Sequence, residues 1–173
     1  MEIICYSAVN SPLGLLYLAT RSQILCALTL GKNAREKHHS YLQRTYPGSE
    51  LKKSDLDLKA AIEQLDGYFA GERTHFDLEL ETPGTLFQKS VWDELLNIPY
   101  GKTISYGALA NRLGNPGGMR AVGAANGQNP IPIIIPCHRV IAADGSLGGY
   151  TGGLEIKHKL LELERQKNTP SLF

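Results

Sequence analysis

The sequence changes character at residues 79–84 (ELETPG), and this change limits the folds open to the chain. Short apolar runs separated by turn residues precede the segment, which is typical of strands. After it, apolar residues recur at helical spacing. Because Pro83-Gly84 interrupts strands and helices alike, we predict a linker here between two domains, residues 1–82 and 85–173, in a chain of 173 residues.

The N-terminal part predicts a small antiparallel sheet with helices on one face. The expected strands are residues 3–6, 15–20, 24–30 and 76–80, and the expected helices are residues 34–45 and 54–71. The second helix is expected to start at a Ser54/Asp55 cap and to carry four apolar residues at helical spacing: Leu58, Ile62, Leu65 and Phe69. No acid, base and nucleophile gather in this α/β part, so we expect a supporting domain.

The C-terminal part predicts a mostly helical domain. A helix from Thr85 should place one apolar face in the core, made of Phe87, Val91, Trp92, Leu95 and Leu96. Ser105 is expected to cap a helix to Leu113, Gly114-Asn115-Pro116 to turn the chain, and residues 117–127 to form a second helix. Two short helices joined by a tight turn predict a helix-turn-helix, and the fold class is α+β.

The second of these helices has an unusual composition for a helix that reads DNA sequence. Reading base edges requires several long polar side chains, but this helix offers small residues and one long basic side chain, Arg120. Small residues allow the backbone to lie close to DNA without reading its sequence. The alternative is tight packing against other helices, which we would favour if the helix were considered alone.

The distribution of charge bears on this choice. Net charge is only +1, but residues 95–143 contain four basic residues and no acidic residue. The four are Lys102, Arg112, Arg120 and Arg139. A stretch without acids tolerates a phosphate backbone at close range, so we expect moderate, salt-sensitive binding to nucleic acid.

The segment Ile133–Val140 (IIIPCHRV) contains a cysteine, Cys137, that is followed by a histidine and an arginine. A free thiol has a pKa of ~8.5, and a neighbouring positive charge lowers it. An inert buried thiol is the alternative, and the run alone does not decide between the two. The run lies between a proline-rich segment and the glycine-rich loop 148–153, and irregular backbone of this kind often presents catalytic groups.

These motifs resemble the O6-alkylguanine-DNA alkyltransferases. The resemblance rests on PCHRV at 136–140, NPIP at 129–132, GGYTGG at 148–153 and RAVGAAN at 120–126. Residues 87–164 match that family's DNA-binding domain in order and spacing, whereas the first eighty residues match loosely. The resemblance implies a single-turnover repair protein that transfers an alkyl group from O6-alkylguanine in duplex DNA to Cys137, with O4-alkylthymine as a further candidate substrate.

The resemblance also implies roles for individual residues. Cys137 matches the acceptor, His138 matches the base that deprotonates it through a water, and Glu164 matches the carboxylate that orients the histidine. Asn129 matches the residue that organises the turn and the water. Tyr106 matches the phenol that assists guanine departure and nucleotide rotation. A Cys–His–carboxylate array is a common way to form a thiolate at neutral pH.

Contacts with DNA and with the base follow from the same match. Arg120 corresponds to a finger that fills the base stack when the target nucleotide flips out. Tyr106, Ala121, Gly123 and Ala124 are expected at the DNA, and Val140, Tyr150, Thr151 and Pro132 at the flipped base, where the carbonyls of Cys137 and Val140 would read its exocyclic amine.

Other interpretations remain for single residues and for the whole chain. Taken singly, Glu164 is a solvated helix charge, Asn129 a turn residue and Tyr106 a helix aromatic; found together beside PCHRV, they favour the repair site. A cysteine hydrolase would turn over repeatedly, and a non-enzymatic helix-turn-helix binder would acquire no alkyl label.

Compartment and cofactors are constrained more weakly. No run approaches the ~18 apolar residues of a membrane span, and the first residues lack a basic signal-peptide region, so we expect a cytoplasmic monomer with double-stranded DNA as its partner. Cys5 and Cys26 could bind zinc with His38 and His39, but adjacent helix histidines are more often solvated. We expect no metal and no cofactor.

Overall fold

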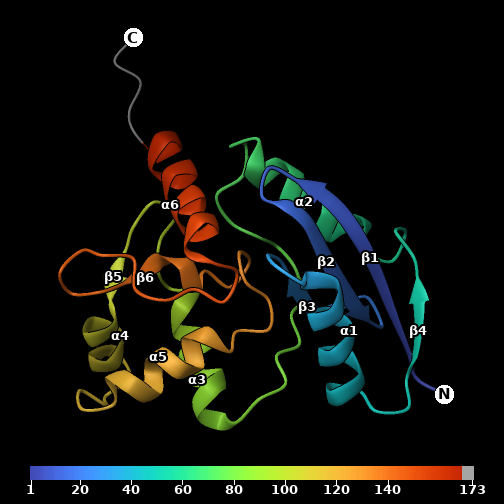
Figure 1. The fold of residues 1–173 in the computed structure, drawn as a ribbon, viewed down its shortest axis with the longest axis horizontal. Helices are drawn as coiled ribbons and strands as arrows, with labels where there is room; N and C mark the ends of the chain where they lie inside the picture. The colour runs from blue at the N-terminus through green and yellow to red at the C-terminus, as the bar shows by residue number, and fades with distance from the viewer. Residues whose placement is uncertain (169–173) are drawn as a thin grey trace. The chain divides into compact units, whose positions relative to one another are not determined.

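The computed structural model describes residues 1–168 and divides into two compact units, Met1–Pro83 and Gly84–Phe173. A four-stranded sheet and two helices form the first unit, and helices dominate the second (Figure 1). The predicted α+β class is therefore confirmed.

The N-terminal sheet has the strand order β3-β2-β1-β4. Its strands are β1 (Ile3–Ser11), β2 (Gly14–Arg21), β3 (Ile24–Thr29) and β4 (Glu50–Lys53). β1, β2 and β3 pair antiparallel, as predicted, and the β1–β2 turn uses Gly14 with φ 94°, a conformation that side chains disfavour. β4 runs parallel to β1, so the sheet is mixed and not wholly antiparallel.

The predicted fourth strand, residues 76–80, is wrong. That segment makes only an isolated bridge between Leu80 and Leu25, and the fourth strand is β4. The sequence of β4, ELKK, is mostly charged and exposed because β4 lies at an edge of the sheet. Charged residues are depleted in strands in general but are common on edges, so the hydrophobic pattern gave no signal there.

The two helices of this unit approach different faces of the sheet. Helix α1 (Ala34–Thr45) packs on β2 and β3, and its His39 ring contacts Tyr6 of β1. The side chain of Ser7, on the opposite face of β1, donates to Asp55 just before α2 (Lys59–Phe69). The prediction of helices on one face is therefore wrong.

Helix α2 begins later than predicted. Ser54 hydrogen-bonds to Asp57 and residues 55–58 form a turn, so the helix starts at Lys59. The most buried row along this segment is Leu58, Ala61, Leu65 and Tyr68. Ile62 and Phe69, two of the four apolar residues noted at helical spacing, are only half-buried.

His38 of α1 is fully buried, and this burial lowers its pKa from 6.5 to about 4. Its Nδ1 atom shares a hydrogen bond of 2.9 Å with Thr29. Among residues 1–168 no three or more His, Cys, Asp or Glu side chains gather as they would around a metal ion.

We predict that acid destabilises the N-terminal unit through His38. Its folded pKa lies below the unfolded value of 6.5, so its contribution is full above pH 6.5 and is lost as pH falls toward 4. The loss should reach about 3 kcal/mol. Hydrogen exchange of residues 1–83 at pH 7, 6, 5 and 4 measures it. His38→Gln should flatten this pH dependence, whereas the exposed His75→Gln should not; identical profiles for both variants would refute the prediction.

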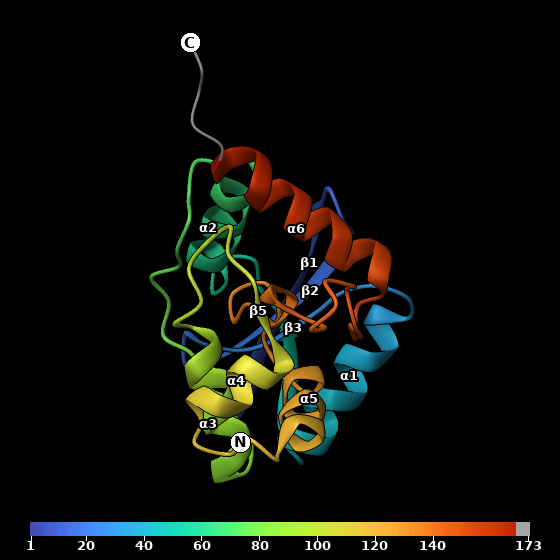
Figure 2. The same cartoon turned by 90° about the vertical axis from the view of Figure 1, so that its left-hand side faces the viewer.

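The C-terminal unit contains the predicted helix-turn-helix. Helix α3 (Leu86–Leu95) is followed by α4 (Tyr106–Arg112), α5 (Met119–Gly127) and α6 (Leu154–Asn168). Ser105 caps α4 by accepting from the Ala108 amide at 3.0 Å, as expected. α5 packs against both α3 and α4 (Figures 1 and 2).

The apolar face of α3 is only partly buried. Val91, Trp92 and Leu95 lie in the core, and the Trp92 indole donates to the Ala125 carbonyl of α5 at 2.9 Å. Phe87 and Leu96 are 37% and 49% exposed because they lie at the two ends of the helix. Their assignment to the core is therefore wrong.

Two short strands that the sequence did not indicate, β5 (Ile104–Ser105) and β6 (Val140–Ile141), pair in parallel. They join the start of α4 to the chain just after Cys137. No helix within the described residues is long and apolar enough to cross a membrane.

Candidate active site

Cys137 begins a single 3-10 turn, Cys137–Arg139, that follows a buried apolar run. The side chain of Asn129 fixes the segment of residues 129–135 that leads to this turn. Its Nδ2 donates to the Ile135 carbonyl at 2.8 Å and its Oδ1 accepts from the Ile131 amide at 2.9 Å. One side chain thus closes both ends of the segment that presents the thiol.

Backbone strain is present in the same segment. Ile133 has φ 74° and is fully buried. A β-branched residue rarely adopts this left-handed conformation, which costs on the order of 1–3 kcal/mol and persists only where packing imposes it. The apolar run therefore serves to hold the loop in one conformation.

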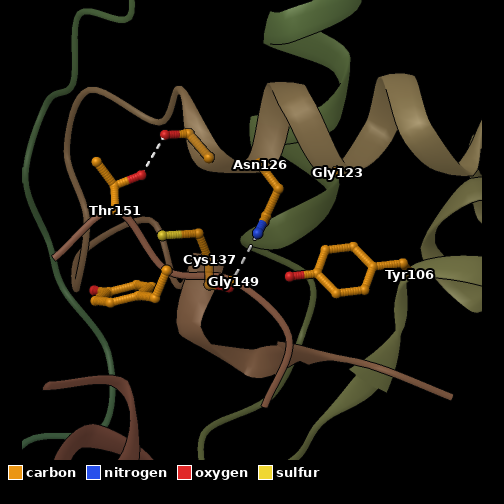
Figure 3. Close-up of a pocket in the computed structure, with 8 residues that line it drawn as sticks. Tyr106, Gly123, Asn126, Cys137, Gly149 and Thr151 are labelled. Carbon is orange, nitrogen blue, oxygen red and sulfur yellow. Dashed lines mark hydrogen bonds between the residues drawn. The ribbon is translucent and has the colours of Figure 1, made fainter. Parts of the chain in front are cut away.

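A cavity of about 420 Å³ opens beside the thiol (Figure 3). Its lining comes from α4, α5, the 3-10 turn and the glycine-rich loop. The lining residues are Tyr106, Gly123, Asn126, Gly127, Cys137, Gly149, Tyr150 and Thr151. The volume falls within the range of small-molecule sites.

The glycine-rich loop is tied to α5 and lies close to Tyr106 at the start of α4. Thr151 donates to the Gly127 carbonyl at the end of α5 at 2.6 Å. Gly148 has φ 69°, and a Cβ there would lie 3.0 Å from the Tyr106 ring. A side chain at position 148 would thus be strained and would push the loop away from Tyr106.

The Cys137 side chain is 5% exposed, and burial raises the pKa of its thiol to about 11. The Asn129 amide, the charge of Lys157 and the Tyr150 hydroxyl each act to lower this pKa. The balance leaves Cys137 as a thiol at neutral pH. Forming the nucleophilic thiolate therefore requires a base.

His138, Arg139 and Glu164 form a buried charged cluster behind the thiol. Glu164 Oε1 accepts from His138 Nε2 at 2.8 Å and from Arg139 Nη2 at 2.9 Å. Its Oε2 accepts from Arg139 Nε at 2.9 Å and from the Gly101 amide at 3.1 Å. Arg139 also donates to the Ile98 carbonyl at 2.6 Å.

The protonation of this cluster follows from its contacts. Burial alone would raise the pKa of Glu164, but the hydrogen bonds and charges of His138 and Arg139 hold it well below its usual range. Burial lowers the pKa of His138. Because an ionised carboxylate only accepts, His138 Nε2 carries the proton, and its Nδ1, which has no partner among the described residues, is the basic atom.

Lys157 of α6 is a polar residue of the site that the sequence analysis missed. It is fully buried, and its ammonium donates to the carbonyls of Val140 (2.6 Å), Gly149 (3.1 Å) and Leu147. The ammonium also lies 5.9 Å from the centre of the Tyr106 ring. Burial lowers its pKa to about 8. Its spacing from Leu160 and Glu164, which places all three on one helix face, was the available signal.

The expected DNA-contacting residues divide into two groups. Arg120, Ala121 and Ala124 are exposed on α5, whereas Gly123 lines the cavity. Of the four basic residues in the acid-free stretch, Arg139 is buried and paired, which contradicts its assignment to a phosphate-facing surface. Arg112 lies 3.5 Å from Glu94.

Two expected substrate residues line the cavity and two do not. Tyr150 and Thr151 are in the lining, but Val140 is fully buried and Pro132 lies outside the lining. The Val140 carbonyl already accepts from Lys157. Asn126, in contrast, lines the cavity, although the sequence analysis gave it no role.

Comparison with known proteins gives matches over nearly the whole chain. The DNA binding domain of 6-O-methylguanine DNA methyltransferase matches residues 86–166, and the ribonuclease-like domain of the same family matches residues 4–82. The methylated-DNA--protein-cysteine methyltransferase of Mycolicibacterium paratuberculosis is 47% identical, over 96% of this chain and 96% of its own length. The protein of that name from Methanosarcina acetivorans is 45% identical, over 92% and 97%.

Solved structures agree with these matches. The Mycobacterium tuberculosis O6-methylguanine methyltransferase has a TM-score of 0.85 and 45% identity, covering 97% of this chain and 96% of that one. The Mycobacterium tuberculosis OGT in complex with DNA has a TM-score of 0.81 and 45% identity, covering 96% of each chain.

Proposed function

The chain belongs to the 6-O-methylguanine DNA methyltransferase family, and we propose that it repairs O6-alkylguanine in duplex DNA by moving the alkyl group onto its own Cys137. The observation that carries the proposal is the position of this thiol. It lies in the cavity wall, with His138 next to it in the chain and held by Glu164. A relative solved with DNA supports DNA as the partner.

The transfer exchanges one bond for another. Cys137 loses its proton to His138, which the family resemblance routes through a water, and the sulfur attacks the alkyl carbon. A carbon–sulfur bond forms as the carbon–O6 bond breaks and its electron pair stays on the guanine. Tyr106, whose hydroxyl points into the cavity (Figure 3), donates a proton to the departing base, and His138 then restores the phenol. Protons therefore balance within the site.

The product explains why one molecule should act once. The alkylated cysteine is a thioether, and its alkyl carbon offers water no carbonyl to attack. Thiolate is also a poor leaving group from such a carbon. We therefore expect each protein molecule to be consumed by one transfer.

Access to the damaged atom requires the nucleotide to leave the duplex. O6 of a stacked guanine is out of reach of a thiol inside a cavity, so the base must flip. Tyr150 and Thr151 line the cavity that would receive it, and Thr151 ties their loop to α5. Asn129 and the strained Ile133 support the rigid placement of Cys137 that such a reaction needs.

Labelling with a methylated duplex tests the proposal. One equivalent of O6-methylguanine DNA should add one CH₂ unit to the Cys137 peptide and leave the protein inactive toward a second equivalent. Repeated turnover would indicate a hydrolase, and an unlabelled protein that binds damage would indicate a non-enzymatic binder. Either result, or label on Cys5 or Cys26, would overturn the proposal.

Arg120→Ala tests the finger that the family resemblance assigns. If Arg120 occupies the gap left by the flipped nucleotide, it helps only where a stack must open, an event that costs a few kcal/mol. Transfer from saturating duplex should fall roughly tenfold or more. Transfer from single-stranded DNA should fall less, and reaction with free O6-alkylguanine should remain nearly unchanged.

Arg112→Ala is the matched control, because Arg112 is another exposed arginine of the helix-turn-helix. A residue that only contacts phosphate weakens duplex affinity and lowers the salt slope by about one unit. Loss of such a residue leaves the single-turnover transfer rate at saturating DNA unchanged. A wild-type rate for Arg120→Ala under those conditions would refute the finger.

We also propose that the protein acts as a monomer in the cytoplasm. Light scattering coupled to size-exclusion chromatography, with and without DNA, measures the oligomeric state directly.

A further inference from the structure

One polar side chain in the cavity has no role in the chemistry described above. Asn126 lies near the end of α5, a helix of mostly small residues, and it is 4% exposed. It nevertheless lines the cavity together with Cys137 and Tyr106. Figure 3 shows its amide pointing from α5 toward the backbone of Cys137, with the Tyr106 hydroxyl pointing into the same space.

The two halves of the Asn126 amide have different contacts. Nδ2 donates to the Cys137 carbonyl at 3.3 Å, which fixes the orientation of the amide. Oδ1 is buried, and no hydrogen-bond donor among residues 1–168 reaches it. A buried acceptor without a donor is unfavourable, typically by about 1–3 kcal/mol. Such an atom in the wall of a ligand cavity is suited to a donor that arrives with the ligand.

The bases that could enter the cavity differ in their donors. Alkylation at O6 removes the N1 proton of guanine, so the exocyclic 2-amino group carries the only N–H bonds left on the base of the nucleotide. O4-alkylthymine has lost its N3 proton and has no amino group, so it carries none. O6-methylhypoxanthine is O6-methylguanine without the 2-amino group and also carries none.

We infer that Asn126 is a specificity-determining residue that recognises the 2-amino group of the flipped guanine through Oδ1. The amine has two N–H bonds, so Oδ1 takes the place of the Val140 carbonyl, which already accepts from Lys157, beside the Cys137 carbonyl that the family resemblance assigns to the same amine. This inference rests on the proposed function and adds a substrate preference to it. Nδ2 holds the Cys137 carbonyl in place, and Oδ1 accepts from the amine, so that guanine satisfies an atom that thymine and hypoxanthine leave unpaired. A site built to accept a hydrogen bond discriminates strongly against analogues that lack the donor.

The test combines a change in the protein with a change in the substrate. Single-turnover transfer rates at saturating duplex are measured for wild type and Asn126→Leu, which has similar volume but no amide. The duplexes carry O6-methylguanine, O6-methylhypoxanthine or O4-methylthymine. In Asn126→Leu the guanine rate should fall roughly tenfold, the other two rates should change little, and the guanine preference should fall by the same factor.

Controls separate recognition from a general effect on the fold. A misfolded fraction lowers the amplitude of transfer with all three substrates and leaves the single-turnover rates of the folded fraction unchanged. Gln128→Leu makes the same kind of change two residues away, at an exposed position where Gln128 accepts from Gln88, and should preserve the wild-type ratios. Asn126→Ala repeats the experiment with a smaller side chain and should give the same loss of preference.

The outcomes distinguish this inference from the proposed function. Wild-type ratios in both Asn126 variants would overturn the inference and leave alkyl transfer to Cys137 intact. Equal loss with all three substrates would also overturn it, because Asn126 would then only hold the Cys137 carbonyl. A wild-type protein that removes the alkyl group from none of the duplexes would instead refute the proposed function.

Discussion

Cys137→Ala should abolish alkyl transfer completely while DNA binding persists. The thiol supplies the sulfur of the product, and none of the other residues in the cavity lining is a cysteine. Alanine fits the space that the buried thiol occupies, and losing one sulfur atom from a packed position costs on the order of 1 kcal/mol. The exposed residues of α5 expected at the DNA are unchanged by this substitution.

Two measurements check the expected result. Transfer is followed by loss of labelled methyl from an O6-methylguanine duplex, and binding by fluorescence anisotropy of the same duplex. Cys26→Ala is the matched control, since Cys26 is also a buried thiol but belongs to the N-terminal unit. Residual transfer by Cys137→Ala, or loss of transfer in Cys26→Ala, would contradict the assignment.

Glu164→Gln should both destabilise the protein and slow the reaction. Glutamine keeps the shape of the side chain but removes the negative charge that faces His138 and the buried Arg139. Breaking a buried ion pair from one side typically costs about 3–5 kcal/mol. Without the carboxylate His138 also becomes a weaker base, because Glu164 acts to raise its pKa.

The expected pH behaviour follows from the same contacts. The folded pKa of Glu164 lies far below its ordinary value of 4.5, so its stabilising contribution is full above that value and is lost as pH falls further. Wild type should therefore lose stability below about pH 4.5 more steeply than Glu164→Gln. In the variant, alkylation of Cys137 by iodoacetamide should require a higher pH than in wild type.

Glu162→Gln provides the comparison on the same helix. Glu162 pairs with Arg165, which is largely exposed, and surface pairs contribute about 0–1 kcal/mol. Glu162→Gln should have the same urea midpoint of unfolding as wild type. Its pH profile for alkylation of Cys137 by iodoacetamide should also match wild type. If the profile of Glu164→Gln also matched wild type, Glu164 would have no influence on the reactivity of Cys137.

Local sequence patterns predicted much of the fold. The Ser105 cap, the Gly/Pro turn and the strands of the first hairpin were recognisable because each depends on neighbouring residues. β4 and the burial of Arg139 were not, because each depends on a partner distant in sequence: β1 for the strand and Glu164 for the arginine. Lys157 was missed for the same reason, since its three carbonyl acceptors meet only in the folded chain.

The candidate site shows the same division. The family motif identified Cys137 and His138 directly, and the structure brings Glu164 to His138 as the resemblance implied. The catalytic roles themselves stay predictions until the variants are measured. Asn126 could not be singled out from sequence, because an asparagine near a helix end is ordinarily a capping residue. Only the burial of its Oδ1 without a donor sets it apart.

The burial of Arg139 has a consequence for how long the protein stays at any one place on a genome. Its charge is neutralised internally by Glu164, so Arg139 displaces no counterion from DNA. Each phosphate contact that is absent makes the slope of log DNA affinity against log salt concentration shallower by about 0.9. A protein with few such contacts dwells briefly on undamaged duplex and moves on by sliding and hopping. A long dwell time is then expected only where a base has entered the cavity, which allows a molecule that reacts once to inspect many sites before it is used.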